Sequence, residues 1–356
     1  ESGPSGYQLG SISGDNCVQN TDNTASATVV KDGTMCIFNN LVNRASITVI
    51  KNAVEDSNVV FDFNLTGGVS RTFQLEDDGN ENDGAPSQWS ISSLLPGSFT
   101  LSESLTNAEW KLTDLTCTSS LQQDIKDPDN SVTFTLSPGE SMICTFTNTK
   151  LGEVKALKYQ DLNGDGDFTK EELPYLGGWE MTLYAGFDCQ GVPLAVKTTQ
   201  AGGPAVFSGL LPGNYSVKET MQSDWMETDG LCRNYTITAG QEQSQKFGNF
   251  QLFDISGTKY EDRNKDGDQD AQESGIEGWK IELQKLNDNT GTYEYFDETV
   301  TDINGWYKFM DLSPGSYKVM EESKVGWEFV NPLIGYHTFT AMSGVDKDLD
   351  FGNVSK

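Results

Sequence analysis

Three polar residues, Lys, Glu and Asn, recur as a set three times on segments that otherwise alternate apolar and polar residues. Side chains along a β-strand alternate between its two faces, so residues two positions apart share a face. Lys51, for example, shares a face with Ile47 and Val49. The three sets are Lys51, Glu103 and Asn148; Lys158, Glu219 and Asn249; and Lys259, Glu321 and Asn353. Polar groups on an apolar face are costly unless they satisfy one another, so the pattern predicts three internal polar sites in an all-β protein.

The chemistry that each set favours is a spontaneous isopeptide bond between Lys and Asn. Burial disfavours the ammonium form of Lys and favours the protonated form of Glu. A neutral Lys is a nucleophile, and a neutral Glu can polarise the Asn carboxamide and shuttle protons while ammonia leaves. The alternative is a simple Lys–Glu ion pair with an Asn nearby. Recurrence of the set at matching strand positions favours the isopeptide bond, with Glu103, Glu219 and Glu321 as the catalytic residues.

The same recurrence divides the chain into domains. Each Glu lies seven positions after the Pro of a Pro-Gly turn, and successive terminal Asn residues lie roughly 100 residues apart, which is one small domain per repeat. Val, Thr, Tyr and Phe alternate with polar residues between Gly, Pro, Asn and Asp turns, as in strands. The predicted domains are an incomplete repeat at 1–44 and complete repeats at 45–150, 151–250 and 251–356.

The repeats resemble the B-type repeats of Gram-positive surface adhesins and pilins, the Cna-B-like and Sdr-type families. The third complete repeat carries the resemblance in SGTKYEDRNKDGDQDAQESGIEGWKIEL (256–283), TDINGWYKFMDLSPGSYKVMEES (301–323) and LDFGN (349–353). The second matches it in LKYQDLNGDGDFTKEELPYLGGWEMTL (157–183), FSGLLPGNYSVKET (207–220) and FGN (247–249), and the first keeps ISSLLPGSFTLSES (91–104). The resemblance implies transthyretin-like or immunoglobulin-like β-sandwiches in an elongated array, used as stalk modules outside the cell.

The first 44 residues are predicted to be the last strands of a further repeat. TMCIFNN (34–40) aligns with SMICTFTN (141–148), which places Asn40 where Asn148 lies. Asn40 is therefore an orphan isopeptide Asn whose Lys and Glu strands come from elsewhere. They could belong to the same polypeptide, which we favour, or to a neighbouring subunit that completes the domain by strand complementation.

Six cysteines fall into three local pairs: Cys17 with Cys36, Cys117 with Cys144, and Cys189 with Cys232. An even number of cysteines paired within repeats predicts disulfides formed in an oxidising compartment. Zinc is a weak alternative, because the chain has no Cys-x-x-Cys motif and only one His, His337. Disulfides depart from the Gram-positive members of the resembling families, which are poor in cysteine.

Two acidic loops have the ligand spacing of an EF-hand, with oxygen donors at positions 1, 3 and 5, Gly at 6, and Glu at 12. Dense hard oxygen ligands select Ca²⁺, so both loops are predicted calcium sites; the alternative is a solvated Asp-rich turn. The predicted ligands are Asp161, Asn163, Asp165, Asp167 and Glu172 in the second repeat, and Asp262, Asn264, Asp266, Asp268 and Glu273 in the third. The acidic segment 76–84 of the first repeat does not fit the spacing.

The net charge and the sequence motifs exclude several classes of function. The net charge of −29 argues against binding nucleic acid or anionic membranes, and no stretch is apolar enough to insert in a membrane. Each set of Lys, Glu and Asn, called a triad below, reacts only once with itself, so we do not expect the chain to be an enzyme. The predicted function is an extracellular structural stalk or filament braced by isopeptide bonds, disulfides and calcium, with like subunits or further repeats as partners. The alternative is an adhesin whose repeats bind a host or surface ligand directly.

Overall fold

The computed structural model describes residues 6–14, 17–19, 25–27, 36–55, 57–78, 85–121, 124–126 and 129–356. Strands dominate this part of the chain, whose single helical element is the 3₁₀ turn η1 (Lys170–Glu172). No helix within it is long and apolar enough to cross a bilayer. The chain divides into two compact units, residues 1–153 with 208–212 and 237–241, and residues 154–207 with 213–236 and 242–356.

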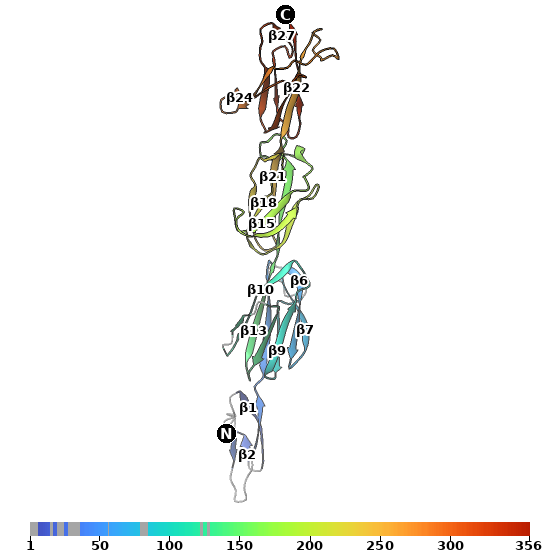
Figure 1. Cartoon of the computed structure of the whole chain (residues 1–356). Helices are drawn as coiled ribbons and strands as arrows, with labels where there is room; N and C mark the ends of the chain where they lie inside the picture. The colour runs from blue at the N-terminus through green and yellow to red at the C-terminus, as the bar shows by residue number, and fades with distance from the viewer. Residues whose placement is uncertain are drawn as a thin grey trace. The chain divides into compact units, whose positions relative to one another are not determined.

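The first sandwich packs a five-stranded sheet, in the order β11-β10-β13-β5-β8, against a four-stranded sheet, in the order β12-β9-β6-β7 (Figure 1). Its strands are β5 (Ala45–Val54), β6 (Ser57–Gly67), β7 (Arg71–Asp77), β8 (Gln88–Leu94), β9 (Gly97–Ser104), β10 (Trp110–Ser119), β11 (Asp124–Lys126), β12 (Ser131–Leu136) and β13 (Ser141–Lys150). The first strand, β5, runs parallel to the last strand, β13, while β10 pairs with β13 from the other side in antiparallel fashion.

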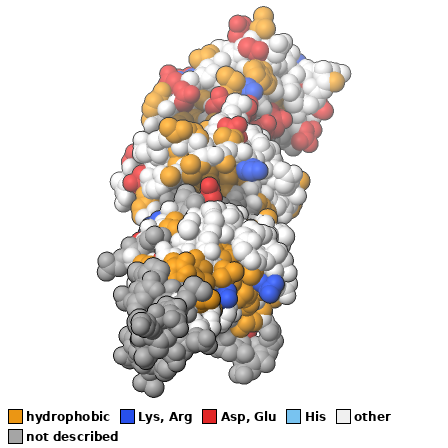
Figure 2. Space-filling model, turned by 90° about the horizontal axis from the view of Figure 1, so that it is seen from below, with side chains coloured by type: hydrophobic (Ala, Val, Ile, Leu, Met, Phe, Trp, Pro, Cys, Tyr) orange, Lys and Arg blue, Asp and Glu red, His pale blue; other side chains and the backbone are white. Residues whose placement is uncertain are grey.

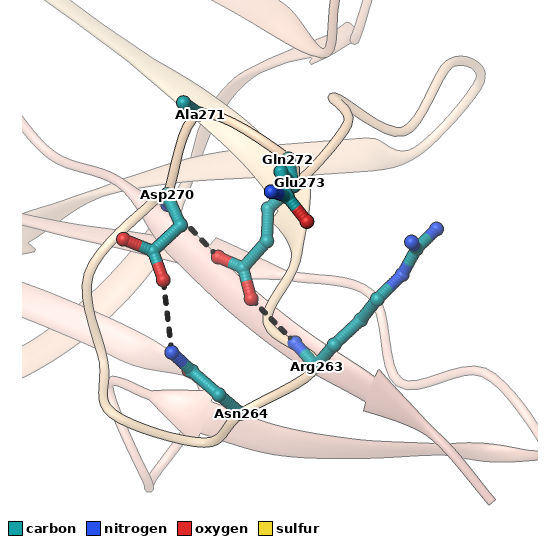
Figure 3. A pocket seen from close by; sticks show the side chains of 6 residues that line it. All are labelled: Arg263, Asn264, Asp270, Ala271, Gln272 and Glu273. Atoms are coloured by element: carbon teal, nitrogen blue, oxygen red, sulfur yellow. Dashed lines mark hydrogen bonds between the residues drawn. The ribbon is translucent and has the colours of Figure 1, made fainter.

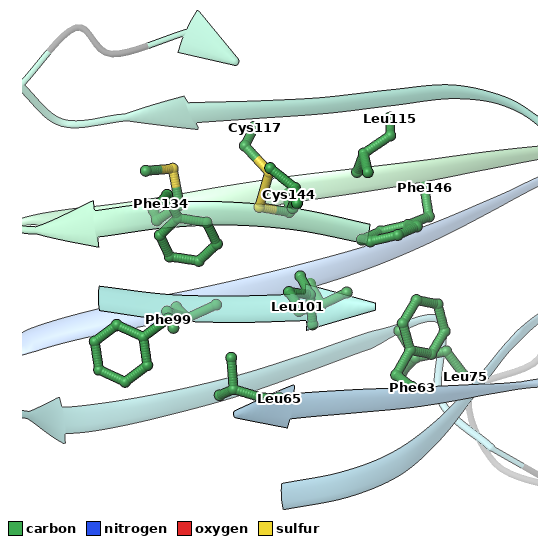
Figure 4. Close-up of a cluster of buried hydrophobic side chains, with 14 of the residues drawn as sticks. Phe63, Leu65, Leu75, Phe99, Leu101, Leu115, Cys117, Phe134, Cys144 and Phe146 are labelled. Atoms are coloured by element: carbon green, nitrogen blue, oxygen red, sulfur yellow. A yellow bond between two sulfur atoms is a disulfide. The ribbon is translucent and has the colours of Figure 1, made fainter. Parts of the chain in front are cut away.

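Alternating side chains fill the space between these two sheets. Every second residue of β5 is buried, as the period of two requires, and the same holds along most of β9. Figure 4 shows Phe99 and Leu101 of β9 facing the Cys117–Cys144 disulfide across the core. Each such side chain contributes about 1.5–3 kcal/mol when it is buried from water, so this layer is the main source of stability.

The second and third sandwiches each have two sheets. The second has the orders β17-β14-β21-β19 and β16-β15-β18-β20; the third has β25-β22-β30-β27, with β29 also on β22, and β24-β23-β26-β28. The second contains β14 (Gly152–Gln160), β15 (Glu180–Ala185), β16 (Pro193–Thr198), β17 (Ala205–Leu210), β18 (Gly213–Glu219), β19 (Trp225–Glu227), β20 (Cys232–Ile237) and β21 (Glu242–Gln251). The third contains β22 (Phe253–Glu261), β23 (Lys280–Asn287), β24 (Thr292–Val300), β25 (Trp306–Leu312), β26 (Ser316–Glu321), β27 (Trp327–Asn331), β28 (Tyr336–Thr340), β29 (Lys347–Asp348) and β30 (Phe351–Ser355). These sheets confirm the prediction of tandem β-sandwich domains.

The N-terminal segment forms two short antiparallel ribbons. The strand β1 (Tyr7–Ser13) pairs with β4 (Ile37–Val42), and β2 (Cys17–Gln19) pairs with β3 (Ala25–Ala27). The register of the β1–β4 ribbon shifts beside the pair Leu9 and Asn40, as the β10–β13 register shifts beside Leu112 and Asn148. At this point the register of the ribbon therefore matches that of the β10–β13 pair in the first sandwich.

Acidic side chains outnumber basic ones on the face drawn in Figure 2. Red Asp and Glu groups gather mainly in the upper part of the picture, while blue Lys and Arg groups are few and lie among white side chains and backbone and orange hydrophobic patches. An excess of 53 acidic over 24 basic residues makes mutual repulsion a general feature of the chain.

Candidate cross-linking site and acidic loops

The strand register brings each triad Lys close to its Asn. In the first sandwich Lys51 lies opposite Phe146 on the parallel strand, and Asn148 lies two positions farther along, on the same face as Phe146. The third sandwich repeats this arrangement, with Lys259 opposite Phe351 and Asn353 two positions on. The Glu comes from the facing sheet, on β9, β18 or β26. All nine triad side chains are buried, and Lys51 is only 2% exposed.

In the first triad, Glu103 contacts both partners. Lys51 Nζ lies 3.7 Å from Glu103 Oε1, and Asn148 Nδ2 donates to the same oxygen at 3.0 Å. Lys51 Nζ also donates to the carbonyl of Phe146 at 3.1 Å. The carboxylate thus lies between the amine and the carboxamide, where it can exchange protons with both.

The second and third triads have the same arrangement with closer ion pairs. Lys158 Nζ lies 2.9 Å from Glu219 Oε2, and Asn249 Nδ2 donates to Glu219 Oε1. In the third, Lys259 Nζ lies 3.2 Å from Glu321 Oε2, and Asn353 donates to that oxygen at 2.8 Å. The structure therefore brings together all nine residues that the sequence assigned to the three sets.

Burial shifts the pKa values of the triads towards neutral side chains. Desolvation lowers the pKa of Lys51, Lys158 and Lys259 to about 8, although the neighbouring Glu opposes the shift. Desolvation also raises the pKa of Glu103 and Glu219, and it raises the pKa of Glu321 to about 7. In the third triad an amine and a carboxylic acid are thus both accessible near neutral pH, as a nucleophile and a proton shuttle require, and the shifts in the other two triads have the same direction.

Four buried polar atoms in the first and third triads support a protonated Glu. Glu103 Oε2, Asn148 Oδ1, Glu321 Oε1 and Asn353 Oδ1 have no hydrogen-bond partner among the residues that the structure describes. All four are acceptors if the Glu is ionised, and unpaired buried acceptors are costly. A proton on the Glu would turn one acceptor of the first triad and one of the third into donors.

An aromatic ring covers each Lys. The Nζ atoms of Lys51, Lys158 and Lys259 lie 4.3, 4.5 and 4.8 Å from the ring centroids of Phe61, Trp179 and Trp279. A Trp contacts each of these rings edge to face, with centroids 5.6, 5.3 and 5.4 Å apart: Trp110 on Phe61, Trp225 on Trp179, and Trp327 on Trp279. The recurring tryptophans therefore shield the triads from water, which maintains the pKa shifts.

The acidic loop of the second sandwich follows β14 directly. Asp161 is fully buried, and its carboxylate accepts from Gly164 N at 2.6 Å and from Gly166 N at 2.8 Å. Glu172 returns to the start of the loop, where its Oε1 accepts from Leu162 N at 3.1 Å. The first and twelfth positions thus lie together, while Asn163, Asp165 and Asp167 are exposed.

The loop of the third sandwich has the same contacts. Asp262 accepts from Lys265 N and Gly267 N, and Glu273 Oε1 accepts from Arg263 N. Asn264 and Asp266 are exposed, as is Asp268. Figure 3 shows Asn264 pointing to the Asp270 carboxylate and Glu273 lying between Arg263 and Asp270, around an open cavity of about 410 Å³.

Two features of the loops fit calcium: their side chains offer oxygen donors, and the Glu at position 12 folds back to the start of the loop. Their carboxylates, however, face backbone N–H groups. No three His, Cys, Asp or Glu side chains in the described part of the chain lie close enough together to hold a metal ion. Calcium binding by these ligands therefore stays a prediction.

All three predicted cysteine pairs are disulfides: Cys17–Cys36, Cys117–Cys144 and Cys189–Cys232. Cys117 and Cys144 lie directly opposite each other on β10 and β13, four residues before Asn148. Asn40 lies on β4, and its side chain is outside the described residues, as is most of the acidic segment 76–84. The role of Asn40 as an orphan acceptor stays a prediction.

Sequence reasoning missed the tyrosine that follows the Lys in two repeats. Tyr159 and Tyr260 donate from their hydroxyls to the carbonyls of Gly166 and Gly267 in the acidic loops. Two sequence features could have pointed to this tyrosine. It follows the triad Lys and lies two residues before the first loop Asp, and in the same repeats a Gly directly precedes the triad Asn.

Comparison with known proteins gives two family matches. Residues 254–350 match the SdrD B-like domain, and residues 47–150 match a prealbumin-like fold domain. Serine-aspartate repeat-containing protein C of Staphylococcus aureus strain MRSA252 is 30% identical over 216 residues, which are 55% of this chain and 21% of that protein. The proteins of that name in strains Newman and USA300 are also 30% identical over 216 residues, which are 20% of each of those proteins. The chain therefore spans about a fifth of the length of these relatives.

Two solved structures are also similar to this chain. The Bacillus anthracis TIE protein is 15% identical, with a TM-score of 0.39, and the match covers 100% of this chain and 67% of that one. BcpA, the major pilin subunit of Bacillus cereus, is 11% identical, with a TM-score of 0.39, and the match covers 88% of this chain and 100% of that one. On the evidence of the family matches and the sandwiches, this chain consists of tandem β-sandwich repeats that resemble the Sdr-type B domains and prealbumin-like domains of surface proteins.

Proposed function

We propose that the chain is a load-bearing stalk or filament segment outside the cell, in which each complete sandwich is braced by a Lys–Asn isopeptide bond. The observation that carries the proposal is the three buried triads, each uniting the first strand of a sandwich with its last. Three disulfides support the extracellular location, because they persist in oxidising compartments.

The reaction needs only the groups of the triad. The neutral Nζ of the Lys attacks Cγ of the Asn, a bond forms between Nζ and Cγ, and the bond between Cγ and Nδ2 breaks. The Glu passes the proton lost by Nζ to the departing nitrogen, which leaves as ammonia. Each triad reacts once and is consumed, so the chain does not turn over substrate.

The position of the bond explains a mechanical role. The Lys residues lie on β5, β14 and β22, and the Asn residues lie on the adjacent last strands β13, β21 and β30. Tension that enters a sandwich through its first strand leaves through its last. A covalent bond between these strands transmits that tension without breaking the hydrogen bonds of the sheets.

The acidic loops would hold calcium through the oxygen atoms of the ten residues named in the two ligand sets. Calcium there would neutralise part of the negative charge and stabilise the loops. Like subunits, or further repeats of the same polypeptide, are the partners that such a segment would join. The adhesin alternative would add a surface ligand to these partners.

The mass of the intact protein tests the proposal. After allowance for three disulfides, the mass should be lower than that of the sequence by one ammonia for each of three bonds. Lys51→Arg, Lys158→Arg and Lys259→Arg should each restore one ammonia. A folded protein with its full unmodified mass would refute the cross-linking function.

A further inference from the structure

A tyrosine connects each acidic loop to the triad of the same sandwich. Tyr159 and Tyr260 directly follow the triad residues Lys158 and Lys259, so they lie on the opposite face of the strand. The hydroxyl of Tyr159 donates to Gly166 O at 3.1 Å, and that of Tyr260 donates to Gly267 O at 2.7 Å. Both tyrosines are almost fully buried. The loop thus covers the tyrosine, and the tyrosine hydroxyl binds the loop.

The same tyrosines pack on the strand that carries the triad Asn. A Cβ atom on Gly352 would lie 2.7 Å from Tyr260 Oη, and one on Gly248 would collide with Tyr159 Oη. These glycines directly precede Asn353 and Asn249, so only a residue without a side chain lets the ring lie against the strand there. The position of the tyrosine therefore constrains the backbone next to the reacting Asn.

The first loop residue makes a second connection. Asp161 N donates to Asn249 O, and Asp262 N donates to Asn353 O, both at 2.8 Å. The carboxylates of these two Asp residues accept from the N–H groups of Gly166 and Gly267, whose carbonyls bind the tyrosines. One continuous set of hydrogen bonds therefore links the loop, the tyrosine hydroxyl and the backbone of the triad Asn.

The first sandwich contains the triad without this set. Asn52 occupies the position of the tyrosine and Thr147 that of the glycine, and their side chains bond to each other at 3.2 Å. Val54 occupies the position of the first loop Asp. The chain therefore carries its own control, a triad of the same kind with no loop attached.

We propose that Tyr159 and Tyr260 are positioning residues for isopeptide formation, through which an acidic loop closed by a divalent cation holds the triad Asn in place for attack. The proposal rests on the cross-linking function and on the calcium binding proposed above. It predicts that cross-linking in the second and third sandwiches depends on calcium and on the tyrosine hydroxyl, whereas cross-linking in the first sandwich depends on neither.

The experiment follows bond formation in the full chain after cell-free synthesis. Translation is stopped, samples are quenched in acid over time, and cross-linked peptides from each sandwich are quantified by mass spectrometry. The chains are the unaltered protein, Tyr159→Phe, Tyr260→Phe, and Tyr235→Phe as a matched control. Tyr235 is a buried tyrosine of the second sandwich whose hydroxyl has no partner in the described structure. Each chain is measured with calcium and with a calcium-selective chelator.

Loss of one hydrogen bond of ordinary strength should slow a step that depends on it about five-fold. Tyr159→Phe should slow only the second sandwich, Tyr260→Phe should slow only the third, and both should reduce the calcium effect there. Tyr235→Phe should change nothing. Calcium should also alter the near-ultraviolet circular dichroism of tyrosine in the unaltered chain, and the two loop variants should reduce that signal.

The outcomes separate this proposal from the function on which it rests. Cross-linking at unaltered rates in both variants, with and without calcium, would overturn the role of the tyrosines while leaving the isopeptide bonds intact. Absence of cross-linking in all three sandwiches would overturn the proposed function itself. If one variant fails to fold its sandwich, the other variant tests the same contacts in the other sandwich.

Discussion

The first and third sandwiches keep the same triad but hold its last strand by different means. In the first, β13 pairs with β5 over nine positions and is joined to β10 by the Cys117–Cys144 disulfide. In the third, β30 pairs with β22 over three positions, and its Asn353 accepts a backbone hydrogen bond from the acidic loop. The third sandwich has no cysteine. The comparison shows two ways to hold the strand of the triad Asn: a long ladder with a disulfide in the first sandwich, and a short ladder with a loop in the third.

The largest effect should follow removal of the third cross-link. Glu321→Ala should prevent the bond between Lys259 and Asn353, which closes a loop of nearly a hundred residues. Such closure is worth about 4 kcal/mol in the free energy of unfolding, or on the order of 20 °C in the Tm of one domain. Glu103→Ala should lower the free energy of unfolding of the first sandwich by less, because the long β5–β13 ladder and the Cys117–Cys144 disulfide remain. Calorimetry measures both values.

The matched control for this prediction is Glu322→Ala, which removes an exposed neighbour of Glu321. It should leave the Tm of the third sandwich almost unchanged. Equal losses for Glu321→Ala and Glu103→Ala would show that the ladder length and the disulfide do not compensate for the missing bond.

The next effect concerns the disulfide of the first sandwich. Replacement of both Cys117 and Cys144 by Ala should lower the free energy of unfolding of that sandwich by about 3 kcal/mol, because the pair closes a loop of moderate length in the core. The third sandwich should keep its stability in the same molecule. Denaturant unfolding followed by limited proteolysis would locate the loss, and an equal loss in both sandwiches would contradict independent bracing.

The smallest effect should be the pH dependence of bond formation in the third sandwich. The reaction needs protonated Glu321, whose pKa is raised to about 7, and neutral Lys259, whose pKa is lowered to about 8. Glu321 loses its proton as the pH rises through the first value, and Lys259 gains one as the pH falls through the second. The rate should therefore peak between them and fall up to tenfold per pH unit outside. A rate that rises steadily to pH 10 would show that Glu321 need not be protonated.

The triads could be predicted from sequence because strand alternation is a strict physical rule. Lys51, Glu103 and Asn148 each sit in a row of apolar residues, so burial follows from period two alone. The disulfides followed from local pairing of an even number of cysteines. The repeat length gave the number of sandwiches.

Other features depend on contacts that no local pattern encodes. The ring over Lys51 is Phe61 of strand β6, whereas the rings over Lys158 and Lys259 are Trp179 and Trp279, which directly precede β15 and β23. A different element therefore brings an aromatic ring to the same place. The function of Tyr159 depends on the loop folding back over it, which spacing cannot show. Ligand spacing likewise predicts donors for calcium without fixing the directions of their carboxylates.

Force spectroscopy on single molecules tests the braced, load-bearing design most directly. A bond between the first and last strands should keep each complete sandwich from extending by more than the few residues outside the bond. Glu103→Ala, Glu219→Ala and Glu321→Ala should each introduce one unfolding step of about a hundred residues. Steps of that length in the unaltered protein, one for each sandwich, would contradict the account.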